Sequence, residues 1–332
     1  MHIGIMHRYP LEQIKETNAS IHYLIEAMKK EGHEVDLLTF KNFNRISSTS
    51  KFWKSIFWIF YSPFLVFGKN YEIIFLDDSY PLYPALVKLV SPKSRVVIRL
   101  GDLHLLYHYS GLTYKFLHFF ERIAWRMADE IIVISEAMGN YVEGEIGRRP
   151  KVILDPVDSK DFPEINTGNE GTVMFHGTLT KNKNVDVLLE AAKRLPRIGF
   201  VIAGDGPDFK RLMRKAPPNV YFAGWVPFKQ IYHHISLCAV GVALRSSSPG
   251  NEYVVTSPFL QYGICGKPCL VTRRKVFGDY KWQFSGVGEL VEKIQILLKR
   301  PEEGEKLRKF VIENHSAEKI AGEIWKILMQ AS

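Results

Sequence analysis

Short apolar runs alternate with helical segments along most of this chain, and this alternation limits its fold more than any other feature. Five such runs lie in the first half: residues 2–6, 34–40, 71–78, 95–102 and 129–135. Between the first two, Ile21, Leu24 and Met28 recur at helical spacing. Runs of this length are typical of buried parallel strands, and helices between them indicate βαβ units. The pattern predicts an α/β fold with a doubly wound parallel sheet.

The pattern stops once and then restarts. Residues 155–172 lose the apolar runs and are rich in Asp, Pro, Gly and Asn, which predicts a linker. New apolar runs follow it at residues 173–177, 199–206, 219–225 and 238–244. We therefore expect two Rossmann-like domains, residues 1–160 and 161–332, which face a cleft. A final helix from about Glu302 to the end is a candidate to pack back on the first domain.

Charge is divided unevenly between the two halves. Residues 1–170 hold 20 Lys and Arg against 21 Asp and Glu, whereas residues 171–332 hold 24 against 14. The excess indicates an anionic ligand in the second half, with solvated surface lysines as the alternative. Nucleic acid is disfavoured, because no basic run in that half is interleaved with base-stacking aromatic residues.

The cysteines and the first residues indicate a reducing compartment. Cys238, Cys265 and Cys269 lie in apolar surroundings without Cys-x-x-Cys spacing, so neither a zinc site nor a disulfide framework is expected. An apolar run begins at residue 2, which leaves no room for a signal peptide. No run is long enough to span a membrane. We expect a cytoplasmic protein.

Residues 246–272 hold a short helix with strong start and stop signals. Ser257 is a suitable N-cap and Pro258 suits the first helical position, while Gly266 and Pro268 end the helix. A helix start offers unpaired N–H groups and partial positive charge, which suit a phosphate. Taken alone, this stretch fits a well-capped connection between two strands better than a binding site.

Residues 41–71 are aromatic and basic, with five basic and no acidic residues. The stretch is too short for a spanning helix and is interrupted by Pro63. Trp and Lys together at an apolar surface suit the interface of an anionic bilayer. An ordinary helix of the first domain is the alternative. We favour peripheral membrane contact through residues 51–67, because the aromatic residues occupy more than one helical face.

Six segments of the chain resemble, in order and spacing, those of family 4-type retaining glycosyltransferases of the GT-B fold (group 1 glycosyl transferases). Four lie in the second half, FHGTLTKNKNVDVLLEAA, FVIAGDGP, VYFAGWV and YGICGKPCLV, and two in the first, GHEVDLLTF and ERIAWRMADEIIVISEAM. The resemblance implies sugar transfer, with retention, from a nucleotide-diphosphate donor held by the second domain. It implies a glycan or polyprenyl-linked acceptor at the first domain, a role in cell-surface glycan biosynthesis, and a place at the inner face of the membrane.

The resemblance also assigns donor residues. Lys183 matches the family's phosphate-binding lysine. Glu252 matches the first glutamate of the Glu-x7-Glu motif, which lies beside the donor sugar, and is a catalytic candidate for that reason. The helix start at Thr256 and Ser257 would offer N–H groups to the same diphosphate. Other residues complete the expected donor set: Gly177, Thr178, Gly204, Gly206, Val226 and Gln261. No Asp-x-Asp occurs in the sequence, so we expect no metal and no other cofactor.

The sequence departs from the family pattern at several of these positions. Gln261 replaces the second glutamate, one residue later than expected, and a neutral acceptor weakens a ribose hydrogen bond by roughly 1 kcal/mol. Thr178 replaces an arginine that contacts phosphate in the family. Asp155-Pro156 replaces Asn-Gly before the linker, and Thr17-Asn18 replaces a glycine pair in the acceptor-side loop.

Two residues are candidates for the acceptor-side catalytic group. A histidine closes the matching strand in the family, whereas here Gly101 or Asp102 stands at that position and His104 follows. Asp102 and His104 are both candidates, with a surface-loop histidine as the alternative for His104.

Two other classes of function remain for a chain of this pattern. A sugar phosphorylase or nucleotide-sugar epimerase would share the phosphate site and would differ in its product. A degenerate domain, suggested by Gln261 and Thr178, would bind nucleotide sugar or scaffold a glycan-assembly complex without turnover.

Overall fold

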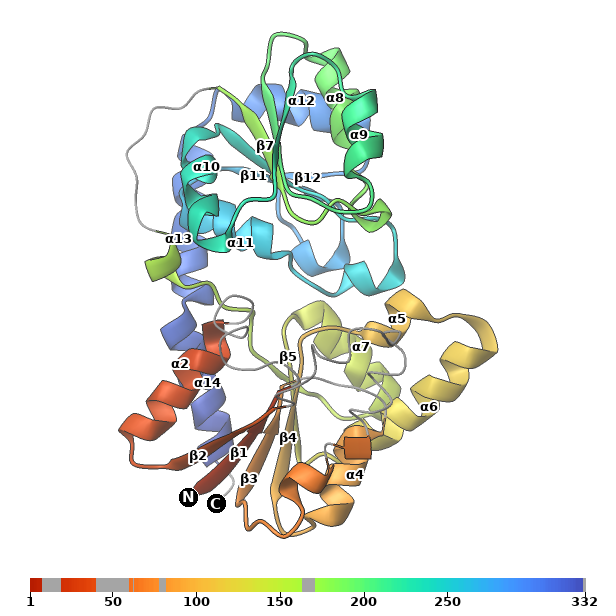
Figure 1. The fold of residues 1–332 in the computed structure, drawn as a ribbon, viewed down its shortest axis with the longest axis vertical. Coiled ribbons are helices and arrows are strands. Elements are labelled where there is room, and N and C mark those ends of the chain that lie inside the picture. Colours follow the sequence, from red (N-terminus) through yellow and green to blue (C-terminus); the bar gives the residue numbers. More distant parts are fainter. Residues whose placement is uncertain (8–18, 40–59, 62, 78–81, 163–170, 331–332) are drawn as a thin grey trace. The chain divides into compact units, whose positions relative to one another are not determined.

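The protein is described here from a computed structural model, which describes residues 1–7, 19–39, 60–61, 63–77, 82–162 and 171–330. The chain forms two compact units. Unit 1 comprises Met1–Pro156, Glu252–Val254 and Ala317–Ser332, and unit 2 comprises Val157–Asn251 and Val255–Ser316. Each unit contains a six-stranded parallel sheet (Figure 1). The prediction of two Rossmann-like α/β domains is therefore confirmed.

The sheet of unit 1 is parallel throughout, with the strand order β2-β1-β3-β4-β5-β6. Its strands are β1 (His2–Met6), β2 (Glu34–Leu38), β3 (Ile73–Leu76), β4 (Arg95–Leu100), β5 (Glu130–Val133) and β6 (Lys151–Val152). β3 is buried along its whole length, because helices cover both faces of the sheet. The strand order changes direction between β1 and β3, which makes this pair the topological switch point of unit 1.

Two layers of helices cover this sheet. Ile21 and Leu24 of α2 (Ala19–Lys30) share a core with Ile320 and Ile324 of α14 (Ala317–Met329) on one face. Figure 1 shows these two helices side by side. The helices of the other face, together with helical residues 60–61 and 63–66, are α4 (Tyr83–Val90), α5 (His104–His108), α6 (Gly111–Met127) and α7 (Glu136–Ile146).

The sheet of unit 2 is also parallel, with the order β12-β11-β10-β7-β8-β9. Its strands are β7 (Val173–His176), β8 (Phe200–Ala203), β9 (Val220–Gly224), β10 (Val240–Ala243), β11 (Cys269–Thr272) and β12 (Gln283–Phe284). This is the order of dinucleotide-binding sheets, and it reverses between β7 and β10.

Helices again lie on both faces. One face carries α8 (Asp186–Arg194), α9 (Phe209–Lys215) and α12 (Val287–Leu297). The other carries α10 (Ile231–Leu237), α11 (Ser257–Ile264) and α13 (Glu302–His315).

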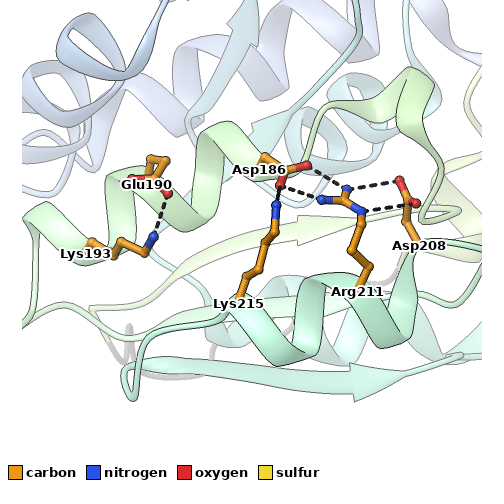
Figure 2. Close-up of polar contacts among 6 residues, drawn as sticks. All are labelled: Asp186, Glu190, Lys193, Asp208, Arg211 and Lys215. Carbon is orange, nitrogen blue, oxygen red and sulfur yellow. Dashed lines mark hydrogen bonds and ion pairs between the residues drawn. The ribbon is translucent and has the colours of Figure 1, made fainter.

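An arginine joins α8 to α9 on the surface of unit 2. Both Nη atoms of Arg211 lie 2.7 Å from the Asp186 carboxylate, and Arg211 also bonds Asp208 (Figure 2). Lys215 adds a contact to Asp186 at 3.4 Å. Partly exposed pairs of this kind contribute about 1 kcal/mol or less each. Their effect is positional, because Asp186 begins α8 directly after the turn that carries Lys183.

The expectation of one helix from Glu302 to the end is wrong. The segment forms two helices, α13 and α14, separated at Ser316, whose backbone is extended. Ser316 pairs with Val157, and the Val157 N–H donates to the His315 carbonyl at 2.8 Å. The break falls where the chain passes from unit 2 to unit 1.

Candidate functional site

The candidate site lies at the switch point of unit 2, at the carboxyl ends of β7 and β10. Lys183 ends a 3-10 helix, Lys181–Lys183, in the connection after β7, and Arg245 is the second residue after β10. Ligands of open α/β sheets bind at this place, because the loops after the two strands turn to opposite faces of the sheet.

Glycines bring the loops after β7 and β8 together. Gly204 and Gly206 have φ angles of 152° and 155°. A Cβ at Gly204 would collide with the carbonyl oxygen of Gly177, and one at Gly206 would collide with the backbone of Leu179. The Leu179 N–H donates to the Asp205 carbonyl at 2.9 Å. The predicted donor residues Gly177, Gly204 and Gly206 thus lie together, where only glycine fits.

The loop after β10 is bonded to the residue that precedes Lys183. The Ser246 N–H donates to the Asn182 carbonyl at 2.8 Å, and the Ser246 hydroxyl bonds the Asn182 side chain. Asn251, which is buried, donates to the Ser246 carbonyl at 3.0 Å and to Asn182 Oδ1 at 3.3 Å. These bonds hold the Lys183 turn against the loop that carries Arg245.

Lys183 lies near a second cation, Arg245. Burial, and secondarily the nearby charge of Arg245, lowers the pKa of Lys183 to about 8. Within the described part of the chain, no carboxylate pairs with either side chain. Burial, and secondarily Lys183, lowers the pKa of His176 to about 3, so this histidine is neutral at pH 7. The arrangement suits an anion.

The helix α11 packs against β7 through Tyr262. The Tyr262 hydroxyl donates to the Met174 carbonyl of β7 at 2.8 Å, and its ring lies 5.0 Å from that of His176. Gly241 in β10 allows this packing, because a Cβ there would collide with the Tyr262 ring. Because α11 follows β10 in the chain, its N-terminus lies toward the carboxyl end of that strand, as the Lys183 turn lies after β7.

Three buried polar atoms in this region have no hydrogen-bond partner within the described residues: Thr256 Oγ1, His176 Nε2 and Arg245 Nε. Thr256 is the N-cap residue of α11 and its side chain makes no capping bond. Leaving a buried polar group unpaired costs about 1–3 kcal/mol. A ligand that bonds these atoms would offset that cost.

The predicted N-cap of this helix is wrong by one residue. Thr256, with extended backbone, occupies the N-cap, Ser257 is the first helical residue and is exposed, and Pro258 is the second. The predicted end is confirmed. Gly266 has a φ of 67°, and the Lys267 N–H donates to the Tyr262 carbonyl at 2.9 Å, which closes the helix.

The remaining predicted donor residues of unit 2 lie at or near this end of the sheet. Thr178 is exposed after β7, Val226 is partly buried after β9, and Gln261 is partly buried on α11. Their contact with a nucleotide stays a prediction.

The predicted catalytic residues belong to unit 1. Asp102 follows β4 and its carboxylate accepts the Leu103 N–H at 2.8 Å, while His104 begins α5. Glu252 ends the 3-10 helix Pro249–Glu252 and is grouped with unit 1. Their catalytic roles stay predictions. Thr17 and Asn18 lie outside the described residues.

Unit 1 has its own charged cluster, which the sequence analysis missed. Arg99 of β4 is buried and donates to Asp77 at 2.9 Å and to Asp155 at 2.7 Å. His7, after β1, lies 3.5 Å from Asp77, which follows β3. Arg245 was missed as well. In both cases the available signal was an arginine at the end of an apolar run.

Across its described residues the chain has no group of three His, Cys, Asp or Glu side chains placed to hold a metal ion. All three cysteines are free thiols. None of the helices in the described ranges is both long and apolar enough to cross a bilayer.

Solved structures with this fold include several glycosyltransferases. Sucrose-phosphate synthase (tll1590) from Thermosynechococcus elongatus is 15% identical with a TM-score of 0.78, over 100% of both chains. A glycosyltransferase from Rickettsia africae ESF-5 is 12% identical with a TM-score of 0.75, over 100% of this chain and 99% of that one. The pneumococcal O-GlcNAc transferase GtfA is 15% identical with a TM-score of 0.61, over 82% of this chain and 59% of that one.

Sequence families give the corresponding result. No curated protein sequence matches this chain. The family described as Glycosyl transferases group 1 matches residues 170–328, and the one described as Glycosyltransferase Family 4 matches residues 17–161. The two matches together extend over most of the chain, which therefore belongs to the group 1, family 4-type glycosyltransferases of the GT-B fold.

Proposed function

We propose that this glycosyltransferase binds a nucleoside-diphosphate sugar in unit 2, with the diphosphate at the carboxyl ends of β7 and β10. The observation that carries the proposal is the adjacent pair Lys183 and Arg245, which has no carboxylate partner among the described residues. The unpaired Thr256 Oγ1 and His176 Nε2 add buried polar atoms at the same end of the sheet.

In the proposed reaction, these groups stabilise the leaving diphosphate. The bond between the anomeric carbon and the diphosphate oxygen breaks, and negative charge develops on that oxygen. Lys183, Arg245 and the N–H groups at the start of α11 are positive before the reaction begins, so they need no reorganisation as the charge appears. We propose that no metal is required for this step.

The sugar and the acceptor would be handled by the other predicted residues. Glu252 lies beside the donor sugar and Gln261 bonds the ribose hydroxyls in this proposal. The acceptor oxygen attacks the anomeric carbon with retention, and Asp102 or His104 orients the attacking hydroxyl and takes its proton.

Two related structures support the class of donor. Pneumococcal GtfA was solved with UDP and GlcNAc, and S. aureus TarM with UDP and alpha-GlcNAc-glycerol. For this protein we propose a nucleotide sugar as the donor and a glycan or a polyprenyl-linked molecule as the acceptor. We propose that the reaction belongs to a pathway of cell-surface glycan assembly.

We also propose that the protein contacts the inner face of the membrane through residues 51–67. Residues 51–59 and 62 lie outside the described residues. Of the rest, Phe60, Phe64 and Phe67 are exposed whereas Val66 is buried. Exposed phenylalanines support this contact, which would bring a lipid-linked acceptor to unit 1.

The test is a donor screen followed by product analysis. Thermal-shift measurements against UDP-, GDP-, ADP- and TDP-sugars should identify a stabilising donor, and purified protein should then hydrolyse or transfer its sugar. Retention predicts a product with the anomeric configuration of the donor, measured by NMR. Binding without hydrolysis or transfer would contradict the proposed catalysis, and absence of stabilisation by every nucleotide sugar would contradict the proposed donor site.

A further inference from the structure

The outward face of α6 is apolar, which is unusual for a surface helix. Leu112, Phe116 and Phe119 follow one another at spacings of four and three residues and are 84%, 64% and 58% exposed. The opposite side of the helix holds buried residues, including Ala124 and Trp125. The helix thus has an ordinary core face and a second apolar stripe that no described residue covers.

Neighbouring helices of the same face of the unit 1 sheet also expose large apolar side chains. Val66, Val87 of α4 and Trp125 of α6 share one core, so their helices lie in the same layer. In Figure 1, α4 and α6 lie on the same side of this sheet, and the two helices contact each other. All large apolar side chains that the described part of unit 1 exposes belong to this layer: Phe60, Phe64, Phe67, Leu89, Leu112, Phe116 and Phe119.

The charges of α6 match an anionic partner. Lys115 and Arg126 are exposed, and Arg122 is partly exposed. The one acidic residue of the helix, Glu121, is buried and bonded to His118 at 2.9 Å. The exposed surface of α6 therefore combines phenylalanine rings with positive charge and presents no carboxylate of its own.

Contacts with α7 fix α6 in place, so no binding partner is needed to hold it. His118 lies 2.9 Å from Glu121 and 3.1 Å from Glu145 of α7, so it links the two helices. The hydroxyls of Tyr114 and Tyr141 share a hydrogen bond of 2.9 Å between the same helices. Because α6 is held by α7, its stripe is preformed, and binding does not have to order it.

We propose that α6 lies along an anionic phospholipid surface, with Leu112, Phe116 and Phe119 at the boundary of headgroups and acyl chains and Lys115 and Arg126 near the lipid phosphates. A second copy of the chain fits this face less well, because a two-fold contact would bring the basic residues of both copies together. The inference extends the membrane contact of the proposed function to a second element. The importance of this contact for a lipid-linked acceptor rests on the proposed function, whereas the binding of α6 to the membrane does not.

The test compares binding of the full chain to vesicles of phosphatidylcholine with and without phosphatidylglycerol. Wild type should bind the anionic vesicles, and added salt should weaken that binding. Replacing Leu112, Phe116 and Phe119 together by Ser should weaken binding about 100-fold, since each loses its apolar burial at the interface. The matched control replaces Met213, Phe310 and Ile312, exposed apolar residues of unit 2, and should bind like wild type.

Two further variants keep the inference falsifiable. Lys115→Gln with Arg126→Gln leaves the apolar stripe intact and should weaken binding to anionic vesicles at low salt by about fivefold for each charge removed. Replacing Phe60, Phe64 and Phe67 by Ser reports separately on the contact through residues 51–67. Circular dichroism and nucleotide binding by unit 2 should be unchanged in every variant, which separates membrane binding from the donor site.

Several results would overturn the role of α6. The first is that wild type does not bind anionic vesicles. The second is that the α6 triple variant binds like wild type, while only the variant lacking Phe60, Phe64 and Phe67 binds more weakly. The third is that light scattering shows a wild-type dimer and a monomeric α6 triple variant. The last result would assign the stripe to contact between two copies.

Discussion

The two switch points of this molecule have a similar topology and opposite electrostatics. In unit 1, Arg99 lies between the carboxylates of Asp77 and Asp155. In unit 2, Lys183 and Arg245 lie near each other, and no carboxylate among the described residues pairs with them. Both places are carboxyl ends of parallel strands, where ligands of such sheets bind.

The pKa directions follow the same difference. Burial lowers the pKa of Arg99, but the two carboxylates outweigh burial and raise it above its usual value. Burial and Arg245 lower the pKa of Lys183 to about 8, and no carboxylate among the described residues opposes them. The charge of Arg99 is paired with two carboxylates of the same unit and serves the fold. The charge in unit 2 destabilises the free protein and is available to an anion.

Removing Arg99 should give the largest effect, on stability. Arg99→Met leaves two carboxylates facing each other without their counter-ion, and the free energy of unfolding should fall by about 3–5 kcal/mol. Urea denaturation measures the change. Arg149→Met is the matched control, because Arg149 pairs with Glu136 and Glu143 on the surface and should cost about 1 kcal/mol or less. Equal costs for the two variants would remove the contrast between the units.

Removing Lys183 should affect catalysis and leave stability intact. Lys183→Ala should lower kcat/KM by about 100-fold or more, because it removes the desolvated ammonium group that stabilises the leaving diphosphate. Its free energy of unfolding should be unchanged or slightly higher, since an unpaired cation is removed. Lys181→Ala, in the same turn but exposed, should keep wild-type activity. If the activity of Lys183→Ala stays within a few-fold of wild type, Lys183 is an ordinary surface charge and has no role in catalysis.

Arg245 should contribute less than Lys183. Arg245→Met should lower kcat/KM by about tenfold, because a partly solvated charge is worth less in the transition state. It should also raise the pKa of Lys183, which Arg245 now lowers, and this shift distinguishes direct proximity from a general loss of packing. Arg273→Met, an exposed neighbour, serves as the control and should change neither quantity.

The pH dependence of nucleotide affinity should follow Lys183. With a pKa of about 8 in the free protein, the side chain is charged at pH 7, and the affinity is at its maximum. Above pH 8 the free protein loses this proton and must regain it on binding, so affinity should fall roughly tenfold between pH 7.5 and pH 9. Calorimetry over this range measures the fall. Lys183→Arg should flatten the profile, and a flat wild-type profile would refute the assignment.

Chelation should give the smallest effect. If the protein cations hold the diphosphate, transfer should continue in EDTA with little change, measured on metal-stripped protein and substrate. A strict requirement for added Mg²⁺ or Mn²⁺ in the transfer step would contradict the proposed leaving-group stabilisation by Lys183 and Arg245.

The sequence predicted the sheets well because each buried strand is an apolar run and each connection carries a helical pattern. It missed the N-cap by one residue, because Thr256 and Ser257 are both good caps and only the backbone decides between them. It joined α13 and α14 into one helix, since the break at Ser316 depends on pairing with Val157, about 160 residues earlier. Local sequence does not contain that pairing.

The two arginines were missed for a related reason. Arg99 and Arg245 acquire their roles from neighbours on other strands, so they cannot be interpreted before the strand order is known. Lys183 was found through the family resemblance. The lack of a carboxylate beside it among the described residues became visible only in the structure.

The most direct test of the central claim, that the switch point of unit 2 holds a nucleoside diphosphate, is calorimetry with UDP, GDP, ADP and TDP in EDTA. At least one nucleotide should bind wild type and Lys181→Ala alike, and should bind Lys183→Ala about 100-fold more weakly. Equal binding to wild type and Lys183→Ala, or binding of none of the four to wild type, would contradict the claim.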